Sequence, residues 1–131
     1  MTKVKAAHID TELERVTPLS GRTPTSTGEE LGKAFKTLAP FEGGGVFVGT
    51  YDGEGAWERH TAGDEFVQVI EGSADLIILH EDKEQTLELS AGMVAVVPKG
   101  LWHKFVSNGQ VSVLAATPHP TEHSLESDPR I

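Results

Sequence analysis

Apolar and polar residues alternate in short runs from Phe41 to Thr117, and glycine, proline, asparagine and aspartate separate the runs. The runs are rich in β-branched and aromatic residues and recur about every ten residues, which is typical of strands joined by tight turns. Parallel strands would need helical crossovers, for which this part of the chain leaves no room. The pattern therefore predicts an all-β sandwich or barrel of antiparallel strands, with strands at 46–51, 56–60, 65–72, 73–80, 85–92, 93–98, 101–107 and 111–117.

Turn residues predict where these strands end. Asp52-Gly53 interrupts the first strand, and the charged residues 80–84 form the tip of a hairpin. Asn108-Gly109 is a pair favoured in two-residue hairpin turns. We therefore predict a hairpin between the last two strands.

Residues 1–40 have a different pattern and are predicted to form an N-terminal arm with one short helix. Residues 16–30 are rich in proline, serine, threonine and glycine and have no hydrophobic period, which indicates a loop. Thr27 and Glu30 form a capping-box pair. The helix is expected over residues 30–39, where apolar residues share one face until a proline ends the pattern.

The chain is predicted to form one domain, because its 131 residues suffice for a single hydrophobic core. The barrel occupies residues 41–117. Residues 118–131 contain three prolines and many charges, so we expect a C-terminal tail that runs over the surface as a strap and not as a strand.

Composition and charge narrow the range of functions. The chain has no cysteine, which excludes disulfides, thiolate metal sites and cysteine nucleophiles. A formal net charge of −9 argues against binding nucleic acid through its phosphates. The charged N-terminus is unlike a secretory signal, and no run of apolar residues is long enough to span a membrane. We therefore expect a cytoplasmic protein with neither nucleic acid nor membrane as a partner.

Four residues with metal-binding side chains stand at strand positions. Glu58 and His60 are two apart, so they leave the same face of a strand. Glu65 opens the next strand, whose residues on the same face are apolar, and a buried carboxylate needs a partner such as a cation. His103 lies in a strand of similar character. Two imidazoles and two carboxylates that converge from three strands would suit a divalent first-row metal.

The spacing of these residues resembles that of a known family. Residues 92–103 read Gly-x5-Pro-x-Gly-x2-His, and residues 60–72 read His-x4-Glu-x6-Gly. Together they resemble the two motifs of the cupins, which are small double-stranded β-helix (jelly-roll) barrels. Three positions depart from the family pattern: the asparagine of the second motif comes one place late, at Asn108, and the first motif has Glu58 for its first histidine and Asp52 for its opening glycine.

The resemblance implies a metal site and a homodimer. The usual cupin site has three imidazoles and one carboxylate, so the ligands here would be His60, Glu65 and His103, with Glu58 as a fourth. A second carboxylate favours Fe, Mn or Zn over Cu, with Ni as a further candidate. If Glu58 does not bind, the other three resemble the facial triad of non-haem iron oxygenases, and Glu58 becomes a catalytic general base. The opposing interpretation pairs Glu58 with Arg59 or Lys104 in a barrel without metal.

Three functions follow from these observations. The first is a metal-dependent enzyme of dioxygenase type that acts on a small organic molecule. The second is a non-catalytic module that senses a metal or ligand. The third, a metal-free sugar isomerase or epimerase, would need an acid/base pair, and Tyr51 is the only tyrosine. Trp57 and Trp102 each precede a candidate ligand and should face away from it. His119 and His123 are expected to be exposed unless the tail folds over the barrel mouth.

Overall fold

The structure is a computed structural model that describes residues 3–131. Its helices are α1 (Ile9–Leu13) and α2 (Gly28–Ala34). Its strands are β1 (Leu19–Arg22), β2 (Phe35–Phe41), β3 (Gly44–Glu54), β4 (Trp57–His60), β5 (Glu65–Glu71), β6 (Ser73–Leu79), β7 (Glu84–Ser90), β8 (Val94–Val97), β9 (Trp102–Thr117) and β10 (Thr121–Ser124). Among the described residues, no helix is long and apolar enough to cross a membrane.

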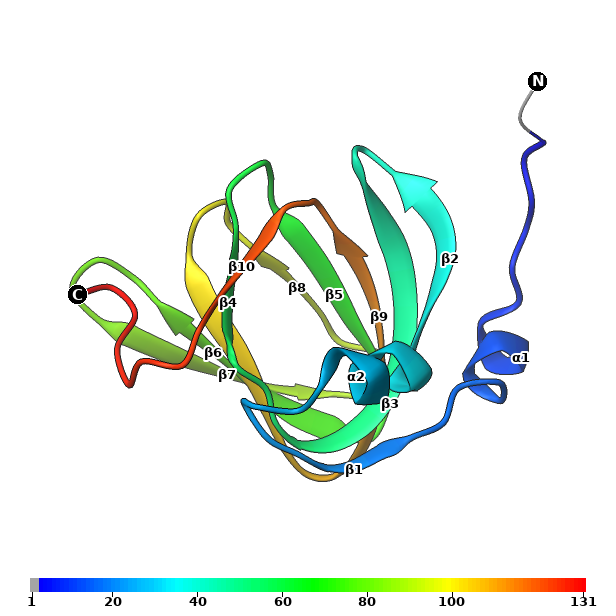
Figure 1. Cartoon of the computed structure of the whole chain (residues 1–131), viewed down its shortest axis with the longest axis horizontal. Coiled ribbons are helices and arrows are strands. Elements are labelled where there is room, and N and C mark those ends of the chain that lie inside the picture. The colour runs from blue at the N-terminus through cyan, green and yellow to red at the C-terminus, as the bar shows by residue number, and fades with distance from the viewer. Residues whose placement is uncertain (1–2) are drawn as a thin grey trace.

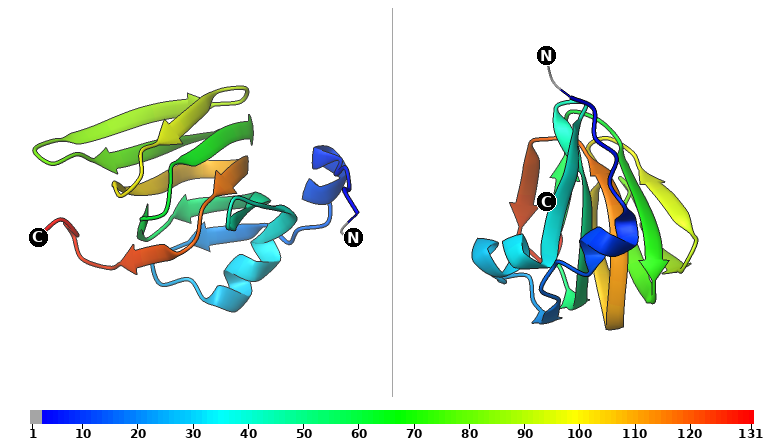
Figure 2. Two further views of the ribbon diagram at one scale, coloured as in Figure 1. Left: turned by 90° about the horizontal axis from the view of Figure 1, so that it is seen from above. Right: turned by 90° about the vertical axis from the view of Figure 1, so that its right-hand side faces the viewer.

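The strands form an open barrel with two faces that share the long strand β9 (Figure 1). The C-terminal half of β9 lies between β3 and β5, and β2 and β8 complete that face. The N-terminal half of β9 lies between β4 and β6, and β10 and β7 complete the other face. Both helices stand outside the barrel next to its first strands (Figure 2). The predicted all-β barrel is confirmed. One pair departs from the predicted antiparallel arrangement: β1, which lies in the segment predicted as a loop, pairs with β3 in parallel.

The hydrophobic core fills one part of the space between the two faces. Tyr51, Val69, Leu76 and Val111 come from four different strands and are all at most 1% exposed. Inward and outward residues alternate along β5, as the sequence predicted. The remainder of the interior, toward the first residue of β5, is lined by polar side chains as well as apolar ones.

The predicted hairpin at Asn108-Gly109 is wrong, because β9 runs through both residues without turning back. The pairing of β3 with β9 shifts there, and β9 contains two more residues than β3 between the paired positions. Ser107 stabilises the bulge by donating a hydrogen bond to the carbonyl of Ser73, at 2.9 Å. An Asn-Gly pair suits a bulge that bends a strand as well as a tight turn. The predicted break at Asp52 is also wrong, since β3 continues to Glu54.

The hairpin predicted at residues 80–84 is confirmed. It joins β6 to β7, and the amide of His80 donates to the carbonyl of Lys83 at 2.8 Å. The β6–β7 hairpin projects from the barrel, at the left of Figure 1.

The predicted helix begins two residues before the expected range of 30–39 and ends five residues before the end of that range. The side chains of Thr27 and Glu30 each accept from the other's backbone amide, which confirms the capping box. Residues 35–41, predicted to be mostly helical, instead form β2 and pair with β3 through a two-residue turn in which Glu42 and Gly43 both have positive φ. Pairing with the edge of β3 outweighs the local helical pattern. A second helix, α1, was not predicted.

The tail is not the surface strap that the sequence predicted, because Thr121–Ser124 form β10 and pair with β4 in an antiparallel register. Thr121 lies opposite His60, and His123 lies opposite Glu58. Beyond β10, Arg130 donates to the carbonyl of His80 at 2.6 Å, so the end of the chain is fastened to the β6–β7 hairpin. The tail therefore contributes to the neighbourhood of two candidate ligands.

Candidate metal centre

The candidate ligands are brought together at the ends of three strands. His60 ends β4, Glu65 begins β5, and His103 follows the first residue of β9. The turns that precede Glu65 and His103 are joined to each other: Asp64 accepts from the amide of Lys99 at 2.8 Å, and the carbonyl of His60 accepts from the amide of Gly100 at 2.9 Å. These two bonds connect motifs that are almost forty residues apart in sequence.

Glu65 is the centre of the group and is 5% exposed. Its Oε1 is 3.0 Å from Nε2 of His103, and its Oε2 is 3.3 Å from Nε2 of His60. Thr117 donates to Oε2 at 2.7 Å. Burial alone would raise the pKa of Glu65, but its interactions with the two imidazoles outweigh burial and lower the pKa to about 2. Glu65 is therefore an anion inside the barrel.

Both ring nitrogens of His103 face acceptors. Nδ1 donates to the carbonyl of Leu101 at 3.0 Å, and Nε2 is within hydrogen-bonding distance of Glu65. Two acceptors require two protons, and although burial alone would lower the pKa of His103, the bond to Glu65 raises it above its usual range. A metal cation could replace the proton on Nε2 while Leu101 continues to hold the ring.

His60 is 3% exposed and is held from its other side. Its Nδ1 lies 3.0 Å from the hydroxyl of Thr121 on β10. Its Nε2 is buried and has no hydrogen-bond partner among residues 3–131. A buried polar atom without a hydrogen bond is costly, and this nitrogen lies 3.3 Å from Oε2 of Glu65, so its position fits that of a metal ligand.

Glu58 also lies close to the two imidazoles. One ligand atom each from Glu58, His60 and His103 lie within 4.8 Å of one another, which is compatible with a shared ion. Oε1 of Glu58 is 4.0 Å from Nη2 of Arg22 and 3.4 Å from Nε2 of His123. The carboxylate of Glu58 raises the pKa of His123.

The partners that the opposing interpretation named for Glu58 are engaged elsewhere. Arg59 pairs with Glu122 on β10 at 3.1 Å, and Lys104 pairs with Glu54. The cation beside Glu58 is Arg22, from the N-terminal arm. The sequence did not predict that Arg22 approaches Glu58, because no sequence pattern links residues 22 and 58.

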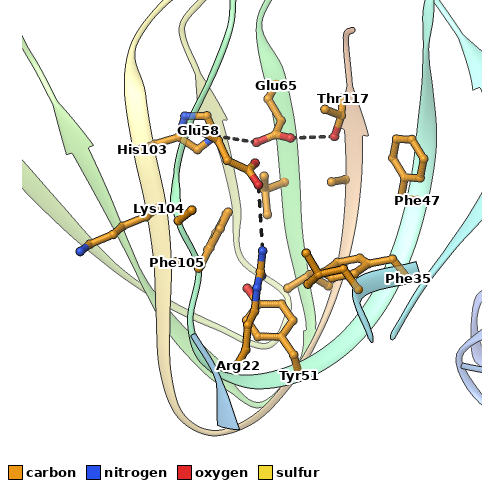
Figure 3. Close-up of a pocket in the computed structure, with 16 residues that line it drawn as sticks. Arg22, Phe35, Phe47, Tyr51, Glu58, Glu65, His103, Lys104, Phe105 and Thr117 are labelled. Atoms are coloured by element: carbon orange, nitrogen blue, oxygen red, sulfur yellow. Dashed lines mark hydrogen bonds and ion pairs between the residues drawn. The ribbon is translucent and has the colours of Figure 1, made fainter. Parts of the chain in front are cut away.

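A cavity of about 210 Å³ opens beside these side chains. Glu58, Glu65 and His103 form one end, and the aromatic rings of Phe35, Phe47 and other apolar residues form the walls (Figure 3). The volume is below the roughly 300–1,000 Å³ of pockets for drug-sized ligands. The cavity is therefore suited to a small organic molecule.

Other residues singled out in the sequence lie at the edge of the site or away from it. Trp57 is buried and Trp102 half-buried, and each ring carries a cation against its face, from Lys104 and Arg59. His123 is exposed but reaches Glu58 because the tail folds back. His119 is exposed and stacks on Phe47, with ring centroids 5.9 Å apart. Thr117 and Thr121, which hold Glu65 and His60, were not predicted, although Thr121 and His123 alternate as residues on one face of a strand do.

A family model described as Cupin domain matches residues 48–117. No curated protein matches the chain. A cupin-2 domain-containing protein from Shewanella frigidimarina is 24% identical, with a TM-score of 0.51 over 69% of this chain and 79% of that one.

Two enzymes share the fold at lower sequence identity. Hydroquinone 1,2-dioxygenase, in complex with Cd²⁺ and 4-hydroxybenzonitrile, is 17% identical, with a TM-score of 0.55 over 64% of this chain and 63% of that one. Oxalate decarboxylase from Bacillus subtilis, described with Mn(II) centres, is 16% identical, with a TM-score of 0.56 over 68% of this chain. This chain spans only 26% of that decarboxylase, so the likeness concerns the fold.

Proposed function

The chain belongs to the cupin domain family, and from that premise we propose that it binds a divalent metal through His60, Glu65 and His103, with Glu58 as a fourth ligand. Ligand atoms of Glu58, His60 and His103 lie close enough to share an ion, and the carboxylate of Glu65 contacts both imidazoles. We further propose that the metal site belongs to a small-molecule enzyme of dioxygenase type. Fe, Mn and Zn are the metals that two carboxylates and two imidazoles favour, with Ni as a further candidate.

The observation that carries this proposal is the state of the two imidazoles. Each Nδ1 is held by the protein, His60 by Thr121 and His103 by Leu101, so each ring directs its Nε2 toward Glu65. Fixing one ring nitrogen by a hydrogen bond is how proteins orient a histidine whose other nitrogen binds a metal. The unpartnered Nε2 of His60 supports the same conclusion.

The chain's own residues bind and orient a substrate beside this group. A divalent metal supplies Lewis-acid or redox chemistry to a small organic molecule. The apolar walls of the cavity exclude water, and Thr117 keeps Glu65 oriented. If Glu58 is not a ligand, its carboxylate lies at the cavity and can accept a proton from the substrate as a general base.

We expect the purified protein to contain about one divalent metal ion per chain, because the candidate ligands converge on a single site. Elemental analysis measures this directly. Oxygen consumption by the metal-loaded protein with a panel of diketones, thiols and phenolic acids then separates an enzyme from a binding module. Metal without turnover on any of them would favour the sensing module, and absence of metal after loading would contradict the metal proposal.

A metal-free acid/base enzyme is the second candidate, because Glu65 and His103 already form a hydrogen-bonded pair and Tyr51 lines the same cavity. Burial raises the pKa of Tyr51 above its usual range, so its phenol stays protonated and can donate a hydrogen bond in the cavity. Activity that survives complete removal of metal by a chelator would favour this candidate.

We also predict a homodimer in the cytoplasm. The exposed valines Val94 and Val96 lie on β8, which within residues 3–131 pairs with β5 alone, and a second subunit would cover such an edge. Light scattering at micromolar concentration should give about twice the chain mass of 14.1 kDa. A mass equal to that of one chain across this range would contradict the prediction.

A further inference from the structure

Arg22 is a buried cation that the proposed metal site does not use. Its side chain is 10% exposed and lines the cavity, with the guanidinium 4.8 Å from the ring centroid of Tyr51 and 5.7 Å from that of Phe35. Nε is buried and has no hydrogen-bond partner within residues 3–131. A buried guanidinium with an unsatisfied donor needs an acceptor.

The neighbouring structure makes a specific place for this side chain. Asp52 accepts from the amide of Gly21 at 2.6 Å and from the hydroxyl of Ser20 at 3.1 Å, which fastens β1 to β3. Gly53 has φ +104, and a Cβ there would overlap the backbone of Arg22. A Cβ at Gly55 would come within 3.2 Å of the guanidinium. The arm is thus held so that Arg22 enters the barrel.

Glu58 does not account for Arg22. Its Oε1 is 4.0 Å from Nη2, beyond hydrogen-bonding distance, and this is the only ion pair of Arg22 in the described part of the chain. The other cation that lines the cavity, Lys104, turns its ammonium outward to Glu54 and Trp57 (Figure 3). Arg22 is therefore the cation that faces the cavity with donors to spare.

We propose that Arg22 binds the carboxylate of the substrate, and that the substrate class is a small carboxylic acid with an aromatic or branched apolar body. The planar guanidinium matches a carboxylate with two parallel hydrogen bonds. The apolar walls, which include Phe35, Phe47 and Val113, would contact the body of the molecule. The bound carboxylate would lie near Glu58, whose Oε1 is 4.0 Å from Nη2 of Arg22, and therefore near the proposed metal site. This placement is the only part of the inference that rests on the proposed function.

Binding of aromatic and branched acids to metal-free protein tests the proposal. Isothermal titration calorimetry would compare benzoate with benzamide, and 3-methylbutanoate with its amide, so that each pair differs mainly in charge. A charge-assisted pair with a buried arginine should make at least one acid bind about tenfold more tightly than its amide. Arg22→Gln should remove this preference, and amide binding that stays measurable in the variant reports that the cavity is intact.

Two further variants control for charge and for folding. Arg15→Gln removes an exposed arginine that pairs with Glu12 outside the cavity, and it should keep the preference. Arg22→Lys keeps a positive charge but loses the planar pair of donors. This variant should therefore keep only part of the preference for acid over amide. Equal binding of acid and amide by the parent protein, or a preference that survives in Arg22→Gln, would overturn the proposal. Because metal is absent throughout, a failed metal proposal would appear only in the elemental analysis.

Discussion

Replacing His103 with alanine is expected to abolish metal binding and to lower the free energy of unfolding of the metal-free protein by about 3 kcal/mol. His103 is 1% exposed, and its imidazole is bonded to a carboxylate that is itself buried. Without the ring, Glu65 loses its shortest contact with a cation and a cavity remains in the barrel. Loss of metal and loss of stability are therefore both large.

Chemical denaturation of the metal-free protein measures the stability, and titration with Zn(II) or Mn(II) measures the affinity. His80→Ala is the matched control, because His80 lies at the tip of the β6–β7 hairpin, where its imidazole bonds to the side chain of Gln85 at 2.7 Å. The substitution leaves the backbone bonds of His80 in place. Its removal should change the stability by no more than about 0.5 kcal/mol and leave the affinity unchanged. A His103→Ala protein that binds metal as tightly as the parent would show that the metal site does not include His103.

The positions of most strands could be predicted because each strand carries its own signal. Along β5 the inward residues Glu65, Val67 and Val69 alternate with outward ones, and one face of a strand is enough to show that period. The residues with metal-binding side chains could be found for the same reason: Glu58 and His60 are neighbours on one strand. Their closeness to His103 could be expected only from the resemblance to a family, since β4 and β9 are far apart in sequence.

The errors arose where a local signal has two physical meanings. Asn108-Gly109 can close a hairpin or open a bulge, and the outcome depends on whether the following residues find a partner ahead or behind. In this chain Val111 and Val113 continue along β3 and β5, so the strand bends and does not reverse. Residues 35–41 have a helical spacing, yet the free edge of β3 recruits them as a strand.

The side chains at the edge of the site could not be predicted from local signals at all. Arg22 lies in a segment whose composition indicates a loop, and it becomes part of the cavity only because Asp52 fastens β1 to the barrel. Thr121 and His123 lie in a proline-rich tail and reach the site because β10 pairs with β4. The division of the chain into three segments, with boundaries at residues 40 and 117, stays a prediction. The strands of the first and last segments belong to the same sheet as the barrel.

The fold leaves the chemistry open, so the residues that differ from the family pattern carry most of the information. Glu58 stands where the family usually has a histidine, and Arg22 and His123 both approach its Oε1. These two cationic groups would compete with a metal ion for the negative charge of the Glu58 carboxylate. Whether Glu58 is a ligand or a base therefore decides how many positions at the metal remain for substrate.

Replacing Glu58 with glutamine is expected to weaken metal binding about tenfold or more while the fold is retained, because the amide keeps the size and one acceptor oxygen but loses the charge. Glu58→His should retain the metal, with a changed preference among metals, since it restores three imidazoles. Competition titrations with a chromogenic chelator measure both affinities, and circular dichroism checks the fold. Glu122→Gln is the control, because Glu122 is a neighbouring exposed carboxylate that pairs with Arg59 and not with the site.

Unchanged affinity in Glu58→Gln would place Glu58 outside the set of ligands. His60, Glu65 and His103 would then hold the metal alone, as a facial triad of two imidazoles and one carboxylate with open positions for substrate. In that case Glu58→Gln should lower kcat strongly with the metal still bound, because an amide cannot accept the proton that a general base removes. A variant that keeps both its metal affinity and its kcat would exclude Glu58 from either role and leave it as the counterion of Arg22 and His123.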